Sequence, residues 1–171
     1  MTPKTPSESV TTITEMVLPN DTNNLDNLMG GRLLHWMDIA TAISAHRHCG
    51  RIVVTACVNN VSFNKPIPTG SIVTMEAKVS RAFNSSMEVF VEVWMENMKS
   101  KGRQKCNEAI YTFVAVDQLG NPIEVPVIAP ETEVEQKRFD GALRRRQLSL
   151  ILSGRMKPED ATELKALFLG E

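Results

Sequence analysis

The sequence predicts an α+β fold in which one long buried helix is wrapped by an antiparallel sheet of five to six strands. Two observations support this fold class. An apolar run from Gly31 to about His48 has helical spacing, and four strand-like segments separated by turns follow it. A polar C-terminal stretch predicts a helical extension beyond the last strand.

The predicted helix is apolar around most of its circumference. Its apolar residues are Leu33, Leu34, Trp36, Met37, Ile39, Ala40, Ala42, Ile43 and Ala45. A helix of this composition belongs in a protein interior. Gly50 follows directly, and a glycine there can take the left-handed conformation that ends a helix.

The strand-like segments follow a short extended piece at residues 15–18 and occupy residues 52–61, 71–83, 87–98 and 105–116. The first is rich in β-branched residues and predicts a central, buried strand. The other three alternate apolar and polar residues, which is typical of strands with one buried face. The edges of such a sheet favour pairing between identical subunits.

The chain is predicted to have three parts. Residues 1–14 are rich in Thr, Ser and Pro and predict a disordered lead-in, residues 15–130 form the main domain, and residues 131–171 form the helical extension. Two helices are expected in the extension, over 131–152 and 158–169. Its Arg144–Arg146 triplet predicts a solvated or inter-subunit face, with a phosphate-binding patch as the alternative.

Composition excludes several classes of protein. The 171 residues carry a formal net charge of −1, so neither nucleic acid nor an anionic membrane is an expected partner. No run reaches the roughly 18–20 apolar residues of a membrane span, and the N-terminus lacks a signal-peptide core. Cys49, Cys57 and Cys106 predict reduced thiols in a cytoplasmic protein. No metal-ligand spacing is present, so no metal site is expected.

The predicted site begins in a polar loop over residues 19–29. Gly30 and Gly31 follow at the helix start, where free N–H groups favour negative charge, and Asp38 lies inside the apolar run. A buried carboxylate is costly unless it is paired or used, so this combination predicts hydrolysis of an acyl group. His35 has the spacing to orient Asp38, but an interior histidine is the favoured interpretation.

Several motifs then resemble one family. Asp21-Thr22-Asn23, Gly30-Gly31, Met37-Asp38 and Arg47-His48 are similar to the acyl-CoA thioester hydrolases of the hotdog fold. Further matching stretches are Val54-Thr55-Ala56, Val61-Ser62-Phe63 and Ser85-Ser86-Met87-Glu88, and the resemblance continues into residues 130–139.

The resemblance implies hydrolysis of acyl-CoA to a carboxylic acid and coenzyme A. It places the catalytic pair on Asn23 and Asp38, which meet from opposite subunits of a dimer. It also implies a hexamer of three dimers, and no cofactor other than the coenzyme A of substrate and product.

Each residue of the implied site has an expected role. Asp38 serves as general base or as nucleophile, and Asn23 orients the water or binds the carbonyl. Backbone N–H groups of Gly30, Gly31 and Arg32 hold the oxyanion. Candidates for binding coenzyme A are Arg81, Asn84, Ser85 and Ser86, with Lys99, Lys101 and Arg103 as alternatives.

Two other functions compete with this one. A hotdog hydratase or dehydratase uses a histidine with an acid, whereas Asn23 stands where that chemistry needs the histidine. A non-catalytic acyl-CoA sensor is expected to carry a DNA-binding module, and no basic helical domain precedes residue 15. A hydrolase with a Ser-His-Asp triad is not supported, because no serine lies in a nucleophile elbow.

Overall fold

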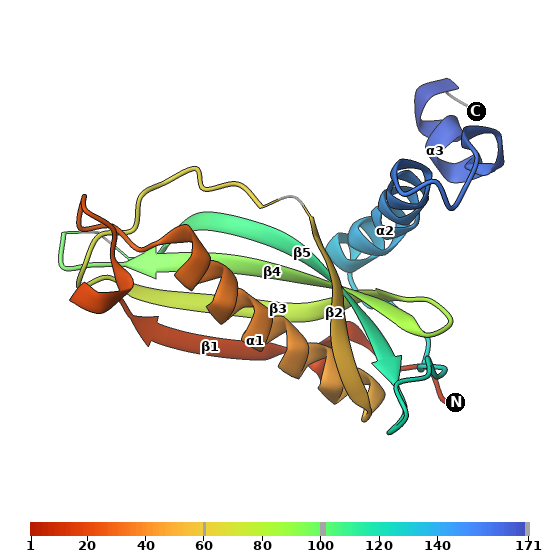
Figure 1. Ribbon diagram of the computed structural model, residues 1–171, viewed down its shortest axis with the longest axis horizontal. Coiled ribbons are helices and arrows are strands. Elements are labelled where there is room, and N and C mark those ends of the chain that lie inside the picture. Colours follow the sequence, from red (N-terminus) through yellow and green to blue (C-terminus); the bar gives the residue numbers. More distant parts are fainter. Residues whose placement is uncertain (60, 100–101, 170–171) are drawn as a thin grey trace. The chain divides into compact units, whose positions relative to one another are not determined.

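The computed structural model describes residues 1–59, 61–99 and 102–169 (Figure 1). The chain divides into two compact units, residues 1–129 and 130–171, a division one residue from the boundary expected from the sequence. The first unit contains a five-stranded sheet and a long helix, and the second contains helices only.

The sheet is antiparallel, with strand order β1-β3-β4-β5-β2. Its strands are β1 (Thr11–Met16), β2 (Ile52–Asn59), β3 (Ile72–Ala82), β4 (Ser86–Glu96) and β5 (Gln104–Val116). The predicted alternation is confirmed, because alternate residues along most of β3, β4 and β5 are buried in the core. These core residues include Val73, Met75, Val89, Val91, Tyr111 and Phe113.

Helix α1 (Gly30–Cys49) lies across one face of the sheet, which curls around it (Figure 1). Its residues Met37, Ala40 and Ala45 are fully buried. Gly50 ends the helix with φ of 63°, and its N–H donates to the His46 carbonyl. This confirms the predicted glycine cap, because other residues rarely adopt that φ.

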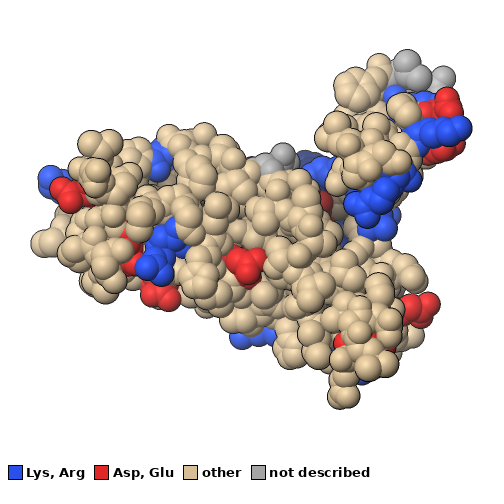
Figure 2. Space-filling model, viewed as in Figure 1, with Lys and Arg blue, Asp and Glu red and all other residues tan. Residues whose placement is uncertain are grey.

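Strand β2 differs from its prediction as a central buried strand. It is an edge strand whose described residues pair with β5, and Ile52, Val54 and Val58 are 56%, 47% and 41% exposed. Ile39 and Ile43, on the outer face of α1, are also exposed. Figure 2 shows few charged side chains on the face that carries α1 and β2. A β-branched composition therefore predicts a strand with apolar contacts, but it does not predict whether those contacts come from the same chain or from another.

The N-terminal segment also differs from the predicted disordered lead-in. Residues Pro6–Ser9 form a 3-10 helix, η1, and β1 begins at Thr11. The Lys4 ammonium donates to the carbonyls of Arg47 and His48 at the end of α1, and the Ser9 hydroxyl accepts from the Val79 N–H at 2.9 Å. The polar composition that suggests disorder thus supplies partners for backbone groups.

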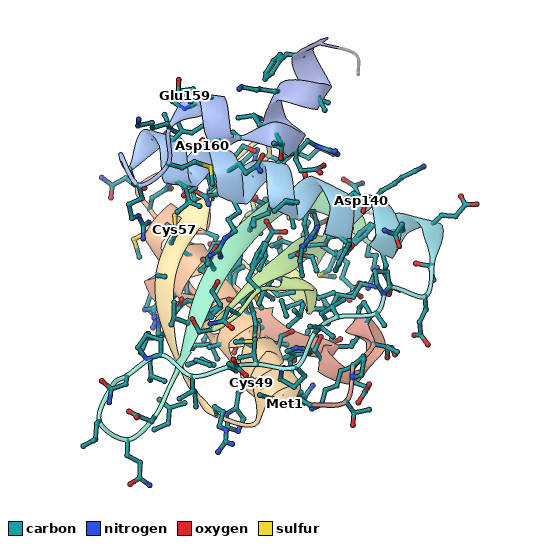
Figure 3. The ribbon with its side chains drawn as sticks, turned by 90° about the vertical axis from the view of Figure 1, so that its right-hand side faces the viewer. Met1, Cys49, Cys57, Asp140, Glu159 and Asp160 are labelled. Carbon is teal, nitrogen blue, oxygen red and sulfur yellow. The ribbon has the colours of Figure 1, made fainter. Side chains whose placement is uncertain are left out.

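The second unit contains α2 (Glu133–Leu152), a 3-10 turn η3 (Pro158–Asp160) and α3 (Thr162–Leu169). Thr132 and Glu135 form a capping box at the start of α2, and the Gln147 side chain accepts from the Leu164 N–H at the start of α3. Figure 3 labels Asp140 on α2 and Glu159 and Asp160 on η3.

All three cysteines are free thiols, and Figure 3 shows Cys49 and Cys57 well apart. Among the described residues, no helix is long and apolar enough to cross a membrane.

Candidate active site

An open cleft of about 500 Å³ lies between the first half of α1 and strands β2 and β5. Its lining residues are Gly31, Leu34, His35, Asp38, Val58, Val61 and Tyr111. Two of the predicted site residues, Gly31 and Asp38, therefore lie at one cleft. Most of the other lining residues are apolar, so the cleft suits an apolar substrate group beside a single carboxylate.

Asp38 is hydrogen-bonded to the neighbouring strand. The Thr55 hydroxyl on β2 donates to Asp38 Oδ1 at 2.9 Å. Asp38 is only half-buried, because it lies toward the face of α1 that the sheet leaves open. The prediction of a buried acid is therefore wrong for the single chain. Thr55 was missed as a site residue, although a hydroxyl within a β-branched apolar strand is the signal that could have identified it.

Tyr111 forms part of the cleft wall. Its hydroxyl donates to the Leu34 carbonyl at 3.1 Å, which links β5 to α1. Burial, and secondly the negative charge of Asp38, raise the pKa of Tyr111 to about 12. The phenol therefore stays protonated near neutral pH and holds the wall in place beside the carboxylate.

His35 lines the same cleft and is exposed. The favoured interpretation of this residue as an interior histidine is wrong. His35 and Asp38 are one helical turn apart, so both lie on the side of α1 that the sheet does not cover.

The start of α1 has no side-chain cap, since Met29 occupies the N-cap position. The Arg32 N–H already donates to the Met29 carbonyl at 3.0 Å, so the Gly30 and Gly31 N–H groups are the better oxyanion donors. A Cβ on Gly30 would lie 3.1 Å from the Phe63 ring, whereas a Cβ on Gly31 would meet nothing within 4 Å. Gly31 therefore leaves open the approach from the cleft to the backbone.

Asn23 lies in the polar loop and is exposed. Its Oδ1 accepts from the N–H groups of Leu25 and Asn27, at 2.9 and 3.3 Å, so its side chain shapes the turn. Asn23 does not line the cleft that contains Asp38 of the same chain. The structure thus brings Asp38 and Gly31 together, but not Asn23.

The predicted coenzyme A residues lie on and beside the β3–β4 turn, and none lines the cleft. Ser86 is buried in β4, while the carbonyls of Asn84 and Ser85 accept from Val125 and Ala115. The Arg81 guanidinium lies 5.5 Å from the Phe83 ring centroid.

Two of the alternative cations, Lys99 and Arg103, lie between β4 and β5. Arg103 pairs with Glu76 at 2.5 Å and stacks on Trp94, and Lys101 lies outside the described residues. The Lys99 N–H donates to the Asn97 side chain. In the described ranges, no group of three or more His, Cys, Asp or Glu residues is arranged to hold a metal ion.

Comparison with known proteins places this geometry in a family. A profile of the thioesterase superfamily matches residues 25–101. The uncharacterized acyl-CoA thioester hydrolase YkhA of Bacillus subtilis is 42% identical over 138 residues, which cover 81% of this chain and 80% of that protein. The chain belongs to the acyl-CoA thioester hydrolases. Its fold is the hotdog fold, as the sequence resemblance implies.

Relatives of this hydrolase include longer proteins. The rat cytosolic acyl coenzyme A thioester hydrolase is 33% identical over 160 residues, which cover 92% of this chain but 42% of the rat protein. The chain therefore spans less than half of that relative.

Two solved structures are similar to the hydrolase over nearly its whole length. The acyl-CoA hydrolase of Staphylococcus aureus, in complex with butyryl coenzyme A and coenzyme A, has a TM-score of 0.81 and 38% identity, covering 89% of this chain and 94% of that one. An apo-hexameric acyl-CoA thioesterase has a TM-score of 0.82 and 32% identity, covering 98% and 99%. Three more structures of the S. aureus hydrolase have an Asp, an Asn or a Thr replaced by Ala.

Proposed function

We propose that the chain hydrolyses acyl-CoA through Asp38 of one subunit and Asn23 of the partner subunit. The observation that carries this proposal is the position of Asp38. It lies in an apolar-lined cleft, accepts a hydrogen bond from Thr55 at 2.9 Å, and shares the cleft with Gly31 at the uncapped start of α1.

Each reacting group then has a partner in the cleft. The carboxylate of Asp38 takes a proton from water, or attacks the carbonyl itself to form a mixed anhydride that water then cleaves. The developing oxyanion binds the N–H groups of Gly30 and Gly31, where one such donor is typically worth about 3–4 kcal/mol. The thiolate of coenzyme A leaves, and the acyl chain occupies the apolar wall of Leu34 and Val58.

The proposal of a shared site rests on the exposed apolar face. Ile39 and Ile43 on α1 and Val54 and Val58 on β2 are exposed in the single chain, and the free edge of β2 can pair with a second copy. A second copy would cover the open side of the cleft and bring its own polar loop to it. We propose a dimer built on this face and a trimer of such dimers.

The substituted structures of the S. aureus hydrolase support the choice of residues. In that protein the Asn precedes the Asp by 15 residues, and the Thr follows the Asp by 17 residues. Asn23, Asp38 and Thr55 have the same spacing here. We assign the third role to Thr55, which fixes the orientation of the Asp38 carboxylate.

Binding of the nucleotide end of coenzyme A stays a proposal for the β3–β4 turn. Arg81 is the cation of that turn, and Asn84 is its exposed amide, whereas Ser85 and Ser86 are more enclosed. We further propose that the hydrolase acts in the cytoplasm on fatty acyl groups, since a relative is named a cytosolic hydrolase and the three cysteines are free thiols.

The direct test measures release of coenzyme A from a panel of acyl-CoA chain lengths by the parent chain and by Asp38→Asn. The parent should hydrolyse part of the panel. Asp38→Asn should lose about 100-fold or more in kcat while keeping its melting temperature, because the amide cannot accept the proton or attack. A variant within a few-fold of the parent contradicts the role of Asp38, and a parent inactive on the whole panel contradicts the proposed function.

A further inference from the structure

Asp21 lies at the crossing of the polar loop with the start of α1. Its backbone N–H donates to the Leu18 carbonyl, and its own carbonyl accepts from the Met29 N–H, both at 2.9 Å. Asp21 therefore connects Leu18, the residue directly before the loop, with Met29, the N-cap residue of the helix. It stands two residues before Asn23 and nine before Gly30.

The side chain of Asp21 strengthens the same junction. Its Oδ2 accepts from the Leu18 N–H at 3.0 Å, and its Oδ1 pairs with Arg32 Nε at 3.0 Å. The Asp21 side chain is 10% exposed and that of Arg32 is 37% exposed. A carboxylate this buried is costly without a partner, so the ion pair constrains where the chain can run.

We infer that Asp21 and Arg32 form a positioning pair that sets the loop so that Asn23 reaches the catalytic cleft of the partner subunit. This inference rests on the proposed function, and it replaces a direct substrate role for Arg32. The far side of the loop is tied as well, since the Leu28 N–H donates to Ile67 and the Thr69 N–H donates to Asp26. Loss of the pair frees the end of the loop that carries Asn23.

The effect on rate follows from the loop's place in the site. A displacement of about 1 Å in a group that orients a substrate can cost about 100-fold in rate. We expect Asp21→Asn and Arg32→Gln each to lower kcat by about 10- to 100-fold. Arg32 Nε makes the contact with Asp21, and a lysine ammonium can also donate to that carboxylate, so Arg32→Lys should recover most of the loss.

Lys105→Gln provides the matched control. The Lys105 side chain is also 37% exposed and pairs with Glu92 and Glu108, but it lies on β5 and does not line the cleft. This substitution removes the ion pairs of a cation that is as exposed as Arg32, and it should leave kcat within about twofold of the parent. Melting temperatures of all variants separate a loss of fold from a loss of rate.

Subunit mixing shows through which residue the pair acts. If Asp21 acts through the loop, a hybrid of Asp21→Asn with Asp38→Asn contains one intact site, because the second subunit supplies a correct loop to the first subunit's Asp38. A hybrid of Asp21→Asn with Asn23→Ala contains two faulty loops and no intact site. We therefore expect recovery to about a quarter of parental activity in the first mixture and none in the second.

The opposite pattern overturns the inference. Recovery with Asn23→Ala but not with Asp38→Asn would show that the pair acts on its own helix start. Parental kcat in Asp21→Asn and Arg32→Gln would show that the pair does not position the loop. The mixture of Asn23→Ala with Asp38→Asn tests the shared site itself, so a failure there refutes the shared site on which this inference rests. Recovery there, together with parental kcat in Asp21→Asn and Arg32→Gln, refutes this inference alone.

Discussion

The Asp38 carboxylate accepts a hydrogen bond from the hydroxyl of a neighbouring strand residue. Thr55 reaches it from β2, a different element, at 2.9 Å. A hydrogen bond to a charged group is typically worth about 1.5–3 kcal/mol, which corresponds to about tenfold or more in a rate that depends on it. If Asp38 is the reacting carboxylate, as we propose, its reactivity therefore depends partly on an exposed strand.

Thr55→Val removes the hydroxyl and keeps the shape of the side chain. We expect kcat to fall about tenfold with little change in melting temperature, because a freed carboxylate samples unproductive orientations. Thr14→Val on β1 is the control, since the hydroxyl of Thr14 hydrogen-bonds with that of Thr74 on β3, and Thr14 does not line the cleft. Equal steady-state rates for Thr55→Val and the parent contradict the orienting role.

His48 couples stability to pH. It is fully buried, and its Nε2 lies 2.6 Å from the Pro126 carbonyl, while Nδ1 has no partner among the described residues. Burial is the main cause that lowers the pKa of His48, and the Lys4 ammonium lowers it further, against the carbonyl of Pro126 and the charge of Glu8. Below pH 6.5 the unfolded chain takes up the proton before the folded chain does.

The free energy of unfolding should therefore be fully retained above pH 6.5 and fall as pH drops from 6.5 toward the lower folded pKa. Urea unfolding of the parent and of His48→Gln between pH 5 and about pH 8 measures this dependence. The glutamine amide can still donate to Pro126, so the variant should show a smaller loss on acidification. The same loss in both proteins contradicts the assignment to His48.

At the scale of the elements, the sequence predicted type and order well. The helix over 30–49, its Gly50 cap and the three alternating strands follow from local periodicity and from one conformational preference of glycine. Each of these patterns lies within one segment of the sequence and does not depend on contacts with other segments or subunits.

The errors have a shared physical cause. The exposure of β2, the half-burial of Asp38 and the exposure of His35 depend on what covers the open side of α1, and local pattern does not report that. The Asp38–Thr55 and Asp21–Arg32 contacts join residues 17 and 11 positions apart, across different elements. Asn23 could be assigned only by resemblance, because the contacts of its side-chain amide within this chain are those of a turn-forming residue.

The helices α2 and α3 form a separate compact unit and carry no residue of the cleft. We expect a chain ended near Pro130 to form a smaller or less heat-stable oligomer and still to hydrolyse acyl-CoA, because the polar helices suit contacts between subunits. Light scattering, melting temperature and activity test this. A truncated chain that keeps its mass and stability but lacks activity places part of the site in these helices.

At the scale of the whole molecule, one chain holds only part of the proposed site. The cleft has a carboxylate, a helix start and an apolar wall, but its outer side is open and the Asn23 loop lies elsewhere. The exposed apolar face of α1 and β2 is the surface on which we propose that a second copy completes the site. The central claim is therefore that catalysis belongs to the pair of subunits.

Subunit mixing of Asn23→Ala with Asp38→Asn tests this claim most directly. Each variant alone should be nearly inactive, and each should keep the parental mass and melting temperature. After subunit exchange has been confirmed, a mixture of equal amounts should recover to about a quarter of parental activity, because half of the dimers are hybrids and each hybrid has one intact site. No recovery after confirmed exchange would place Asn23 and Asp38 in the same subunit's site and contradict the account.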